Sequence, residues 1–457
     1  MSDATSSGLR YQYKTFLDQL PADWKKKPIT QIGKVVGGGT PSREVPSFWR
    51  GPIPWVTPGE VSSEVSKYLH DTNDHISAAG LAGSGANVLP IGSLMVTTRA
   101  TLGARVINAV PMATNQGFKS IAFRQANDAD YYFHLLEKVK PELVRRASGT
   151  TFLEISGAEF GGIVVPSPST PEKKEISQVL DTLDTAIRET ESIISKLNAV
   201  KRGLQDDLLT RGLDANGELR RSQSEAPHLY KESLLGWIPR EWEPVQLGQL
   251  LRELGQGWSP DCPPEPASAN EWGVLKTTSI VWDGYNENEN KRLPNGFKSR
   301  TSLEVAADDI LITRAGPKTR VGVVVHVVST RPGLLISDKM YRLRMLDTEI
   351  AAYFGLAMSA NYAQAAISRT VSGMAESQTN ISQGVIKSLL VLRPPRDEQS
   401  AIVVRSRSID ERLNCEVMQF GKLRQHKKAL MDDLLTGRVR VAPLLEQAEQ
   451  RALEGSA

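Results

Sequence analysis

The sequence reads Lys201-Arg202-Gly203-Leu204-Gln205-Asp206-Asp207-Leu208-Leu209-Thr210 and later Lys427-Lys428-Ala429-Leu430-Met431-Asp432-Asp433-Leu434-Leu435-Thr436, an offset of 226 from Asp206 to Asp432. Other pieces recur in the same order. Residues 20–24 (Leu-Pro-Ala-Asp-Trp) correspond to residues 238–242 (Ile-Pro-Arg-Glu-Trp), and Glu172 corresponds to Glu398. Two copies at so long a period indicate a duplicated domain rather than a solenoid, whose repeats are roughly 20–50 residues long. Two similar modules in one chain suit a ligand with two similar parts.

Composition limits the class of protein. A chain of 457 residues with 40% hydrophobic and 23% charged residues is typical of a soluble protein, and its length predicts about two to four domains. No run approaches the roughly 18 apolar residues of a membrane span, and residues 1–8 do not resemble a signal peptide, so we expect a cytoplasmic protein with no membrane partner. The two cysteines, Cys262 and Cys415, fit a reducing compartment. A net charge of +3 neither requires nor excludes nucleic acid.

Each half begins with a loop-rich region that reads as mixed α/β structure. Short apolar runs beside turn residues predict strands at 53–56 and 92–98 in the first half, and at 274–276 and 310–313 in the second. Helical stretches are expected at 131–146 and 350–367. The sequence therefore predicts two modules of the same mixed α/β class.

Each half ends in a predicted long helix with a coiled-coil seam. From Glu172, a step of 3.5 residues reaches ten positions, of which eight are apolar in the first copy and seven in the second. Thr190 and Lys201 interrupt the first seam, as Ser406, Glu416 and Lys427 interrupt the second. Pro171 is predicted to open the first helix, and Gly212 and Gly437 to follow the two ends. The apolar seam residues are Ile176, Leu180, Leu183, Ile187, Ile194, Leu197, Leu204, Leu208, Ile402, Ile409, Leu413, Phe420, Leu423, Leu430 and Leu434.

A pseudo-two-fold relation between the halves would make the two helices antiparallel and turn them into a spacer with one module at each end. The polar stretch 214–227 would then cross back to the second module. Duplex DNA with two half-sites at a fixed separation is a ligand of matching symmetry. The alternative is that the helices are ordinary amphipathic helices, each packed on its own domain.

The chain resembles the specificity (S, HsdS) subunits of type I restriction-modification enzymes. The resemblance rests on residues 230–242 (from Tyr-Lys to Ile-Pro-Arg-Glu-Trp), 394–399 (Pro-Pro-Arg-Asp-Glu-Gln) and 430–437 (Leu-Met-Asp-Asp-Leu-Leu-Thr-Gly), and on their duplication. The first copy departs from this pattern at 168–173 (Pro-Ser-Thr-Pro-Glu-Lys), and Arg211 precedes Gly212.

The resemblance implies two target recognition domains that each read one part of an asymmetric site in double-stranded DNA. It implies spacer helices that dock two methyltransferase (M) subunits, which methylate adenine, with restriction (R) subunits for cleavage. S-adenosylmethionine, ATP and magnesium would then act in the partners, and this chain would hold no cofactor and no metal. The implied boundaries are 1–20, N-terminal segment; 21–170, first recognition domain; 171–212, spacer; 213–237, linker; 238–395, second recognition domain; 396–437, spacer; 438–457, tail.

Motifs for chemistry are missing from the sequence. It has neither a Gly-x-x-x-x-Gly-Lys-Ser/Thr loop nor an Asn-Pro-Pro-aromatic motif, and its six histidines and two cysteines form no ligand pattern. The pairs Asp206-Asp207 and Asp432-Asp433 are adjacent in helices and point in different directions, so we do not expect them to be catalytic. Two other classes remain: an enzyme, and a scaffold that joins two proteins without binding DNA.

Candidate DNA-binding residues lie in or beside matching turns of the two halves. Arg and Lys suit guanine, Asn and Gln suit adenine, and hydroxyl groups suit phosphates. Trp24 and Trp242, at matching positions, are instead expected to be packing anchors. The candidates are Thr40, Ser42, Arg43, Thr98, Arg99, Thr101, Arg105, Asn115, Gln116 and Lys119 in the first half, and Trp258, Ser259, Thr313, Arg314, Lys318, Thr319, Arg320 and Lys339 in the second.

Overall fold

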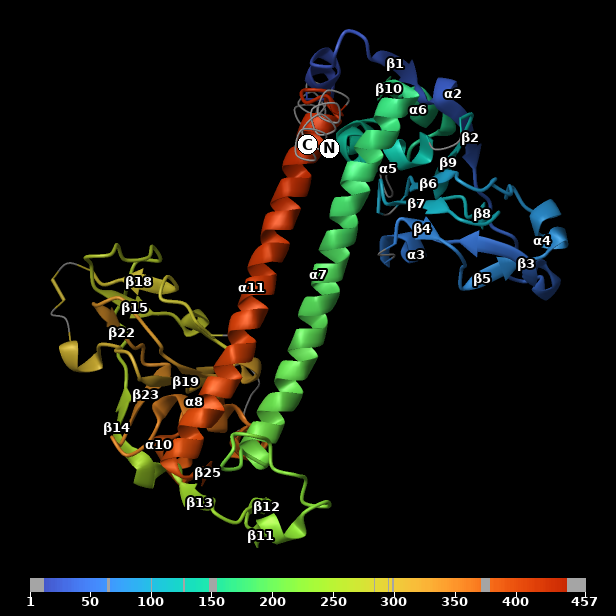
Figure 1. The fold of residues 1–457 in the computed structure, drawn as a ribbon. Helices are drawn as coiled ribbons and strands as arrows, with labels where there is room; N and C mark the ends of the chain where they lie inside the picture. Colours follow the sequence, from blue (N-terminus) through green and yellow to red (C-terminus); the bar gives the residue numbers. More distant parts are fainter. Residues whose placement is uncertain are drawn as a thin grey trace, which may run out of the picture. The chain divides into compact units, whose positions relative to one another are not determined.

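The computed structural model describes residues 12–63, 66–99, 101–125, 128–147, 154–282, 284–294, 296–297, 300–370 and 379–441. The chain divides into two compact units: unit 1 comprises residues up to 191 and from 418 onward, and unit 2 comprises residues 192–417. Each unit holds one mixed α/β module and part of each of two long helices, α7 (Thr170–Thr210) and α11 (Arg396–Leu434) (Figure 1). The predicted class is confirmed. Among the described helices, none has the length and apolarity to cross a membrane.

The module of unit 1 is built on a five-stranded sheet and a three-stranded sheet. The five-stranded sheet has the order β2 (Gly33–Gly37), β9 (Phe118–Phe123), β6 (Leu94–Thr97), β7 (Arg105–Asn108), β4 (Tyr68–Leu69), and the other β5 (Asp74–Ile76), β3 (Trp49–Val56), β8 (Ala113–Thr114). A ribbon of β1 (Lys25–Pro28) and β10 (Val164–Ser167) lies before α7. The helices are α2 (Ile29–Ile32), α3 (Pro58–Ser63), α4 (Ala78–Ala82), α5 (Asp128–Arg146) and α6 (Gly157–Gly161).

The module of unit 2 repeats this plan. Its sheets have the orders β14 (Leu251–Gln256), β23 (Met340–Met345), β19 (Ile310–Thr313), β21 (Val324–His326), and β18 (Asn290–Arg292), β15 (Gly273–Leu275), β22 (Leu334–Leu335). The ribbon before α11 is β13 (Glu243–Gln246) with β25 (Leu390–Arg393). The helices are α8 (Ala351–Ser359), α9 (Asn361–Thr370) and α10 (Gln383–Ser388). Three two-stranded antiparallel pairs are additional: β11 (Tyr230–Ser233) with β12 (Gly236–Pro239), β16 (Ile280–Val281) with β17 (Gly284–Tyr285), and β20 (Ala315–Gly316) with β24 (Thr379–Asn380).

Three local predictions need correction. The helix expected at 350–367 is broken at Ala360, whose backbone is extended, and the Gln364 side chain donates to the Met358 carbonyl oxygen freed there, at 2.8 Å. The expected linker 213–237 includes most of the β11–β12 hairpin. α7 begins at Thr170, so Pro171 lies inside its first turn. Gly212 and Gly437 follow the two helices with φ of 65° and 70°, as predicted for stop signals.

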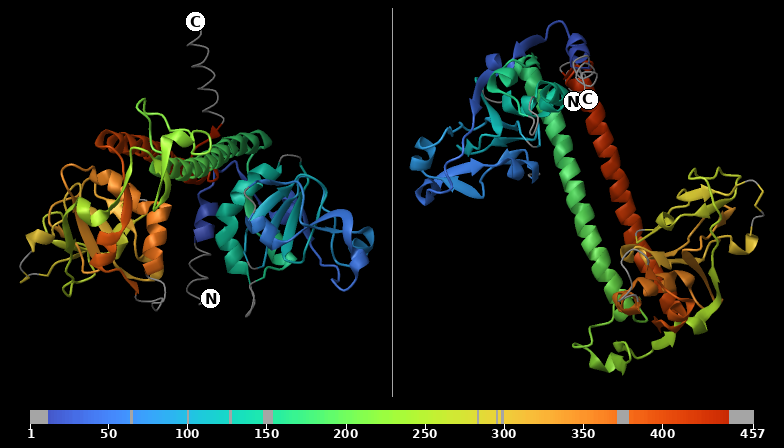
Figure 2. Two further views of the ribbon diagram at one scale, coloured as in Figure 1. Left: turned by 90° about the horizontal axis from the view of Figure 1, so that it is seen from below. Right: turned by 180° about the vertical axis from the view of Figure 1, so that it is seen from behind.

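α7 and α11 contain 41 and 39 residues, which corresponds to roughly 60 Å each at about 1.5 Å per residue. Both are unbroken coils, green and red in Figure 1, and Figure 2 shows them from two further sides. In unit 1, Ile176 and Leu180 near the start of α7 share a core with Leu434 and Leu435 at the end of α11. The two helices are therefore antiparallel in this unit.

The same packing holds in unit 2, where Leu208 at the end of α7 and Ile402 at the start of α11 share a core. The two lysines that interrupt the apolar seam each form an ion pair with an aspartate of the other helix. Lys201 Nζ lies 2.7 Å from Asp410 in unit 2, and Lys427 pairs with Asp184 in unit 1. Asp184 and Asp410 are themselves related by the offset of 226. The polar breaks of the seam therefore form duplicated ion pairs between the helices.

A cluster of one tryptophan, one glutamate and one arginine ties each module to the helices. In unit 1, Trp24 Nε1 donates to Glu172 Oε2 at 3.1 Å, and the Arg440 guanidinium donates to both oxygens of Glu172, at 2.6 and 3.0 Å. Trp24 precedes the module, Glu172 opens α7, and Arg440 follows α11. One carboxylate therefore connects three distant segments of the chain.

Unit 2 contains the same cluster. Trp242 Nε1 donates to Glu398 Oε2 at 3.0 Å, Arg220 donates to both oxygens of Glu398, and the Leu213 amide donates to Oε1 at 2.8 Å. Trp24 and Trp242 are only 4% and 0% exposed, which confirms that they are packing anchors. We call these two arrangements the Trp–Glu–Arg clusters.

The Trp–Glu–Arg clusters should contribute strongly to stability. Glu398→Gln leaves the largely buried Arg220 with only the exposed Glu241 carboxylate at 3.6 Å, so we expect the free energy of unfolding of unit 2 to fall by about 3 kcal/mol. Glu411→Gln, at an exposed position of α11, is the matched control and should change it by less than about 0.5 kcal/mol. Urea unfolding followed by tryptophan fluorescence measures both, and equal midpoints for the two variants would contradict the assignment.

A buried histidine lies between α5 and α7 in unit 1. His134 is 1% exposed, and its Nε2 lies 2.8 Å from Asp181 Oδ1, an oxygen that also accepts from Lys67 Nζ at 2.8 Å. His134, Asp181 and Asp184 could offer metal ligands within 4.8 Å of one another. Lys67 and Lys427 neutralise the two carboxylates, so we interpret the group as an ion-pair network. Burial lowers the pKa of His134, in spite of the Asp181 contact.

The lowered pKa of His134 predicts a pH-dependent stability. Below about pH 6.5, His134 is protonated more readily in the unfolded chain than in the folded one. The contribution of neutral His134 to the free energy of unfolding is therefore complete above about pH 6.5, and it is lost as the pH falls toward and through the lower pKa of the folded state. We expect His134→Gln to lose less stability than wild type between about pH 7 and pH 5.5, whereas His70→Gln, at an exposed position, should follow wild type. Urea midpoints at the two pH values test this; parallel losses in all three proteins would refute it.

Candidate nucleic-acid interface

Three loops meet in each module and are held by the same backbone hydrogen bonds. In unit 1 the Gly39 amide donates to Thr114 O at 2.9 Å, and the Thr98 amide to Gly117 O at 2.7 Å. In unit 2 the Trp258 amide donates to Ile336 O at 3.0 Å, and the Arg314 amide to Lys339 O at 2.9 Å. The loops therefore correspond residue by residue: Thr40 to Ser259, Thr98 to Arg314, Asn115 to Ser337, Gln116 to Asp338, and Gly117 to Lys339.

Two of the predicted contact residues are buried. Thr98 and Thr313 are 0% exposed. The Thr313 hydroxyl donates to Arg320 O and accepts from the Val323 amide at 3.0 Å, and the Thr98 hydroxyl donates to Gly117 O at 3.1 Å. Both hydroxyl groups hold the loops rather than facing a ligand.

An arginine reaches the same place in both modules. Arg99 Nη2 donates to Glu154 Oε2 at 2.6 Å, and Arg314 Nη2 donates to Asn380 Oδ1 at 2.8 Å. Glu154 and Asn380 correspond, since each lies two residues before the serine that caps α6 or α10. Arg99 is one position later than Arg314 in its loop, so the two arginines converge from different backbone positions.

The charge at this place differs between the modules. The hydrogen bond and charge of Arg99 lower the pKa of Glu154, and Lys119 Nζ, 3.7 Å from Glu154 Oε1, adds to this effect. The Glu154 carboxylate therefore stays ionised and offsets part of the positive charge of Arg99 and Lys119. Asn380 is neutral, so no carboxylate offsets the positive charge of Arg314 at this contact, and Arg314 Nη1 donates to Asp338 O at 2.9 Å. Sequence patterns gave no signal for Glu154 or Asn380, because both lie far from the turns in the chain.

Most of the other candidates of the first module gather in these loops. Thr40 donates to Gln116 Oε1, Asn115 Oδ1 accepts from the Gly117 amide at 2.8 Å, and the Thr101 hydroxyl lies 2.7 Å from that of Ser62. Ser42 lies in the loop after β2, and Arg43 stacks on Trp49 with its guanidinium 3.6 Å from the ring centroid. Arg105 is the exception: it donates to Phe133 O and to Glu137 at 3.1 Å, on α5. It belongs to the sheet–helix packing.

In the second module the candidates divide in the same way. Arg320 donates to the Thr277 and Ile280 carbonyls at 2.6 and 3.0 Å and is structural. Ser259 Oγ accepts from the Asp338 amide at 3.2 Å, and Arg300 lies 4.2 Å from the centroid of the Trp258 ring. Lys318, Thr319 and Lys339 are exposed. The loops therefore present basic and hydroxyl groups around an arginine in both units.

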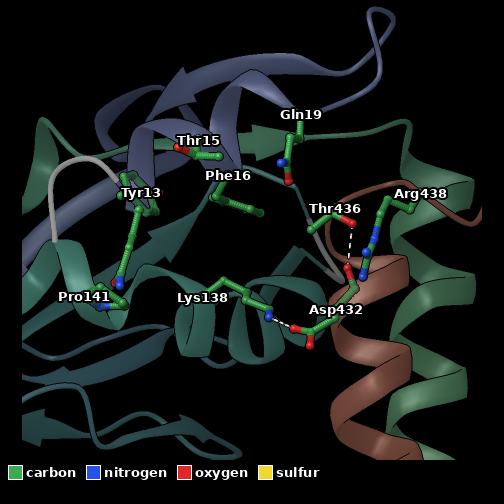
Figure 3. A pocket seen from close by; sticks show the side chains of 10 residues that line it. Tyr13, Thr15, Phe16, Gln19, Lys138, Pro141, Asp432, Thr436 and Arg438 are labelled. Atoms are coloured by element: carbon green, nitrogen blue, oxygen red, sulfur yellow. Dashed lines mark hydrogen bonds and ion pairs between the residues drawn. The ribbon is translucent and has the colours of Figure 1, made fainter. Parts of the chain in front are cut away.

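The paired aspartates have structural partners. Asp432 pairs with Lys138 of α5 at the wall of a pocket of about 420 Å³, where Figure 3 shows the two side chains beside Thr436 and Arg438. In unit 2, Asn361 Nδ2 donates to Asp206 at 3.3 Å. The second aspartates pair with arginines, Asp433 with Arg438 at 2.9 Å and Asp207 with Arg211 at 2.8 Å. The members of each pair thus have different partners.

Comparison with known proteins shows a similarity to the specificity subunits of type I restriction enzymes. Residues 21–199 match the family model of the type I restriction modification DNA specificity domain. The EcoEI specificity subunit of Escherichia coli is 37% identical over 50% of this chain and 41% of its own length; the MjaIX specificity subunit of Methanocaldococcus jannaschii is 28% identical over 52% and 54%. The chain therefore spans about half the length of these relatives. The MjaVIII specificity subunit of the same archaeon is 22% identical over 93% of this chain and 95% of its own length.

The chain is thus similar to type I restriction enzyme specificity subunits, and residues 21–199 match their DNA specificity domain. The S subunit of a type I restriction-modification system from M. genitalium has the same fold, with a TM-score of 0.56 and 13% identity over 91% of this chain and 98% of its own. A chain from a structure of type I restriction-modification complex assembly and conformational transition has a TM-score of 0.50 and 15% identity over 92% and 99%. The match to the family model ends inside α7, and the second module shares the strand order of the first.

Proposed function

We propose that this specificity subunit reads DNA sequence for a type I restriction-modification complex, each module reading one part of a bipartite, asymmetric site in double-stranded DNA. One observation carries the proposal: the loops of the two modules share their backbone hydrogen bonds but differ in their side chains. A common scaffold with different side chains is what two different half-sites of one duplex require. The arginine, lysine, glutamine and hydroxyl groups of these loops suit base edges and phosphates.

The arginines are the first candidates for base contacts. Arg314 rests on a neutral amide and a carbonyl, and it can exchange both for guanine acceptors without stranding a charge. Arg99 must leave the Glu154 carboxylate to do the same. The exposed Thr40, Gln116, Lys318, Thr319 and Lys339 would complete the contacts, with phosphate contacts fixing the register of each module.

The long helices would serve as the spacer between half-sites and as the docking surface for two methyltransferase subunits. Val200 of α7 and Val404 of α11 are 56% and 65% exposed, and a partner helix would cover such side chains. Adenine methylation with S-adenosylmethionine would belong to the methyltransferase subunits, and ATP- and magnesium-dependent cleavage to the restriction subunits. The specificity subunit itself would carry out no bond-making step.

The proposal predicts that the two modules can be altered separately. In cells that express the specificity subunit with its methyltransferase subunits, Arg314→Ala should relax one half-site and Arg99→Ala the other, since a bidentate arginine–guanine contact discriminates by about 1–3 kcal/mol. Arg252→Ala, at an exposed arginine outside the loops, is the control and should leave the site unchanged. Methylome sequencing reads the outcome. The absence of any methylated bipartite motif would favour a scaffold without DNA binding, and changes in both half-sites by one variant would contradict separate reading.

A further inference from the structure

A cavity of about 380 Å³ lies among the recognition loops of unit 2. Its walls come from the loop after β14, the end of β15, β18 and the turn before β23. Three lysines line it, Lys276, Lys291 and Lys339, together with one acidic residue, Asp338. Its lining charge is therefore 3 − 1 = +2. The cavity is large enough to admit a small anion or part of a nucleotide.

Four polar side chains of this cavity, the three lysines and Ser337, lack partners among the described residues. Among the described residues, none of the three lysine ammonium groups forms an ion pair. Ser337, also in the lining, is 6% exposed, and its buried Oγ has no hydrogen-bond partner. An unpaired buried hydroxyl is costly in free energy, and a ligand that accepts its hydrogen bond would remove that cost.

Unit 1 has no such arrangement at the corresponding place. Strand pairing sets the correspondence: Val274 pairs with Lys291, and the matching Trp55 pairs with Asp74, so Asp74 takes the place of Lys291. Lys339 corresponds to Gly117 and Lys276 to Thr57. None of the three lysines is therefore repeated in unit 1.

In unit 1, the side chain that pairs with Asp74 at this place is Arg43. It lies four residues after Gly39, as Cys262 lies four residues after the corresponding Trp258. Arg43 forms an ion pair with Asp74 and stacks on Trp49. The smaller, uncharged Cys262 leaves the place open in unit 2, so the charge there is left for an external ligand.

We propose that the Lys276–Lys291–Lys339 cavity of unit 2 binds a phosphoryl anion. Lysine ammonium groups and a serine hydroxyl together supply charge-assisted hydrogen bonds to phosphate oxygens. Under the proposed function, on which this step rests, the anion is a phosphate of the DNA backbone. The contact positions the second module on the duplex without reading sequence, and the first module has no equivalent of it.

The test uses the full-length chain and two probes. Calorimetric titration with inorganic pyrophosphate measures anion binding alone. Fluorescence anisotropy with a random-sequence duplex of about 40 base pairs, between about 50 and 200 mM salt, measures DNA binding. The variants are Lys276→Ala/Lys291→Ala and Ser337→Ala. The control is Lys387→Ala/Lys422→Ala, which removes the same charge from two exposed positions outside the cavity. Ser337→Ala removes no internal hydrogen bond, so it should fold like wild type.

Both cavity variants should weaken pyrophosphate binding, the double variant by about tenfold or more, while the control stays within about twofold. For the Lys276→Ala/Lys291→Ala variant with duplex DNA, the slope of log K against log salt should become less steep by about 0.9, because one phosphate contact is lost. Wild-type pyrophosphate binding that is absent, or equal in cavity variants and control, would overturn the proposal. Loss of pyrophosphate binding in the variants, with no DNA binding even by wild type, would keep the anion site and reject the DNA-reading function.

Discussion

The carboxylates of Glu172 and Glu398 are the interactions on which each unit depends. Each accepts hydrogen bonds from a tryptophan that precedes a module and from an arginine that follows the opposite long helix. Segments separated by 148 and 268 residues meet at Glu172, and segments separated by 156 and 178 residues meet at Glu398. Because the Glu172 and Glu398 carboxylates are largely buried, each must keep its hydrogen-bonding partners in place to offset the cost of removing its charge from water. The start of each long helix is thereby fixed to its module and to the end of the other helix.

The duplication preserves backbone and anchoring contacts and varies the charge of the loops. The loop hydrogen bonds, the order of the three-stranded sheet and of four strands of the larger sheet, and the lysine–aspartate pair between the helices (Lys201–Asp410 and Lys427–Asp184) occur in both units. Glu154 becomes Asn380, and the Arg43–Asp74 pair becomes Cys262 with Lys291. Changes of this kind leave the strands paired as before, since Val274 pairs with Lys291 as Trp55 pairs with Asp74. A duplicated scaffold can in this way acquire two different binding surfaces.

Much of the fold could be predicted from the sequence, because periodicity and the repeat report directly on helices and on paired positions. The long helices, their stop glycines and the buried Trp24 and Trp242 all follow from these patterns. The break at Ala360 could not be predicted, because it depends on a side chain, that of Gln364, satisfying a backbone carbonyl. At the candidate site, residue type selected Arg99 and Arg314, whose side chains the structure places at matching positions of the two modules. It did not separate them from the buried Thr98 and Thr313 or from Arg105 and Arg320, because burial and internal partners are tertiary properties, and it missed Lys276, Lys291 and Glu154 for the same reason.

The proposed function gives the long helices the role of spacer between two readers, and a change of helix length tests this role most directly. The repeat alone would place matched insertions near Ala199 and Gln425. The Lys201–Asp410 pair shows instead that Arg412 is opposite Ala199 in unit 2. Four residues inserted after each of Ala199 and Arg412 add about 6 Å, or about two base pairs at roughly 3.4 Å each. Methylome sequencing of cells that express this variant with its methyltransferase subunits should show the same two half-sites with a longer gap. An unchanged gap, or altered half-site bases, would contradict the account.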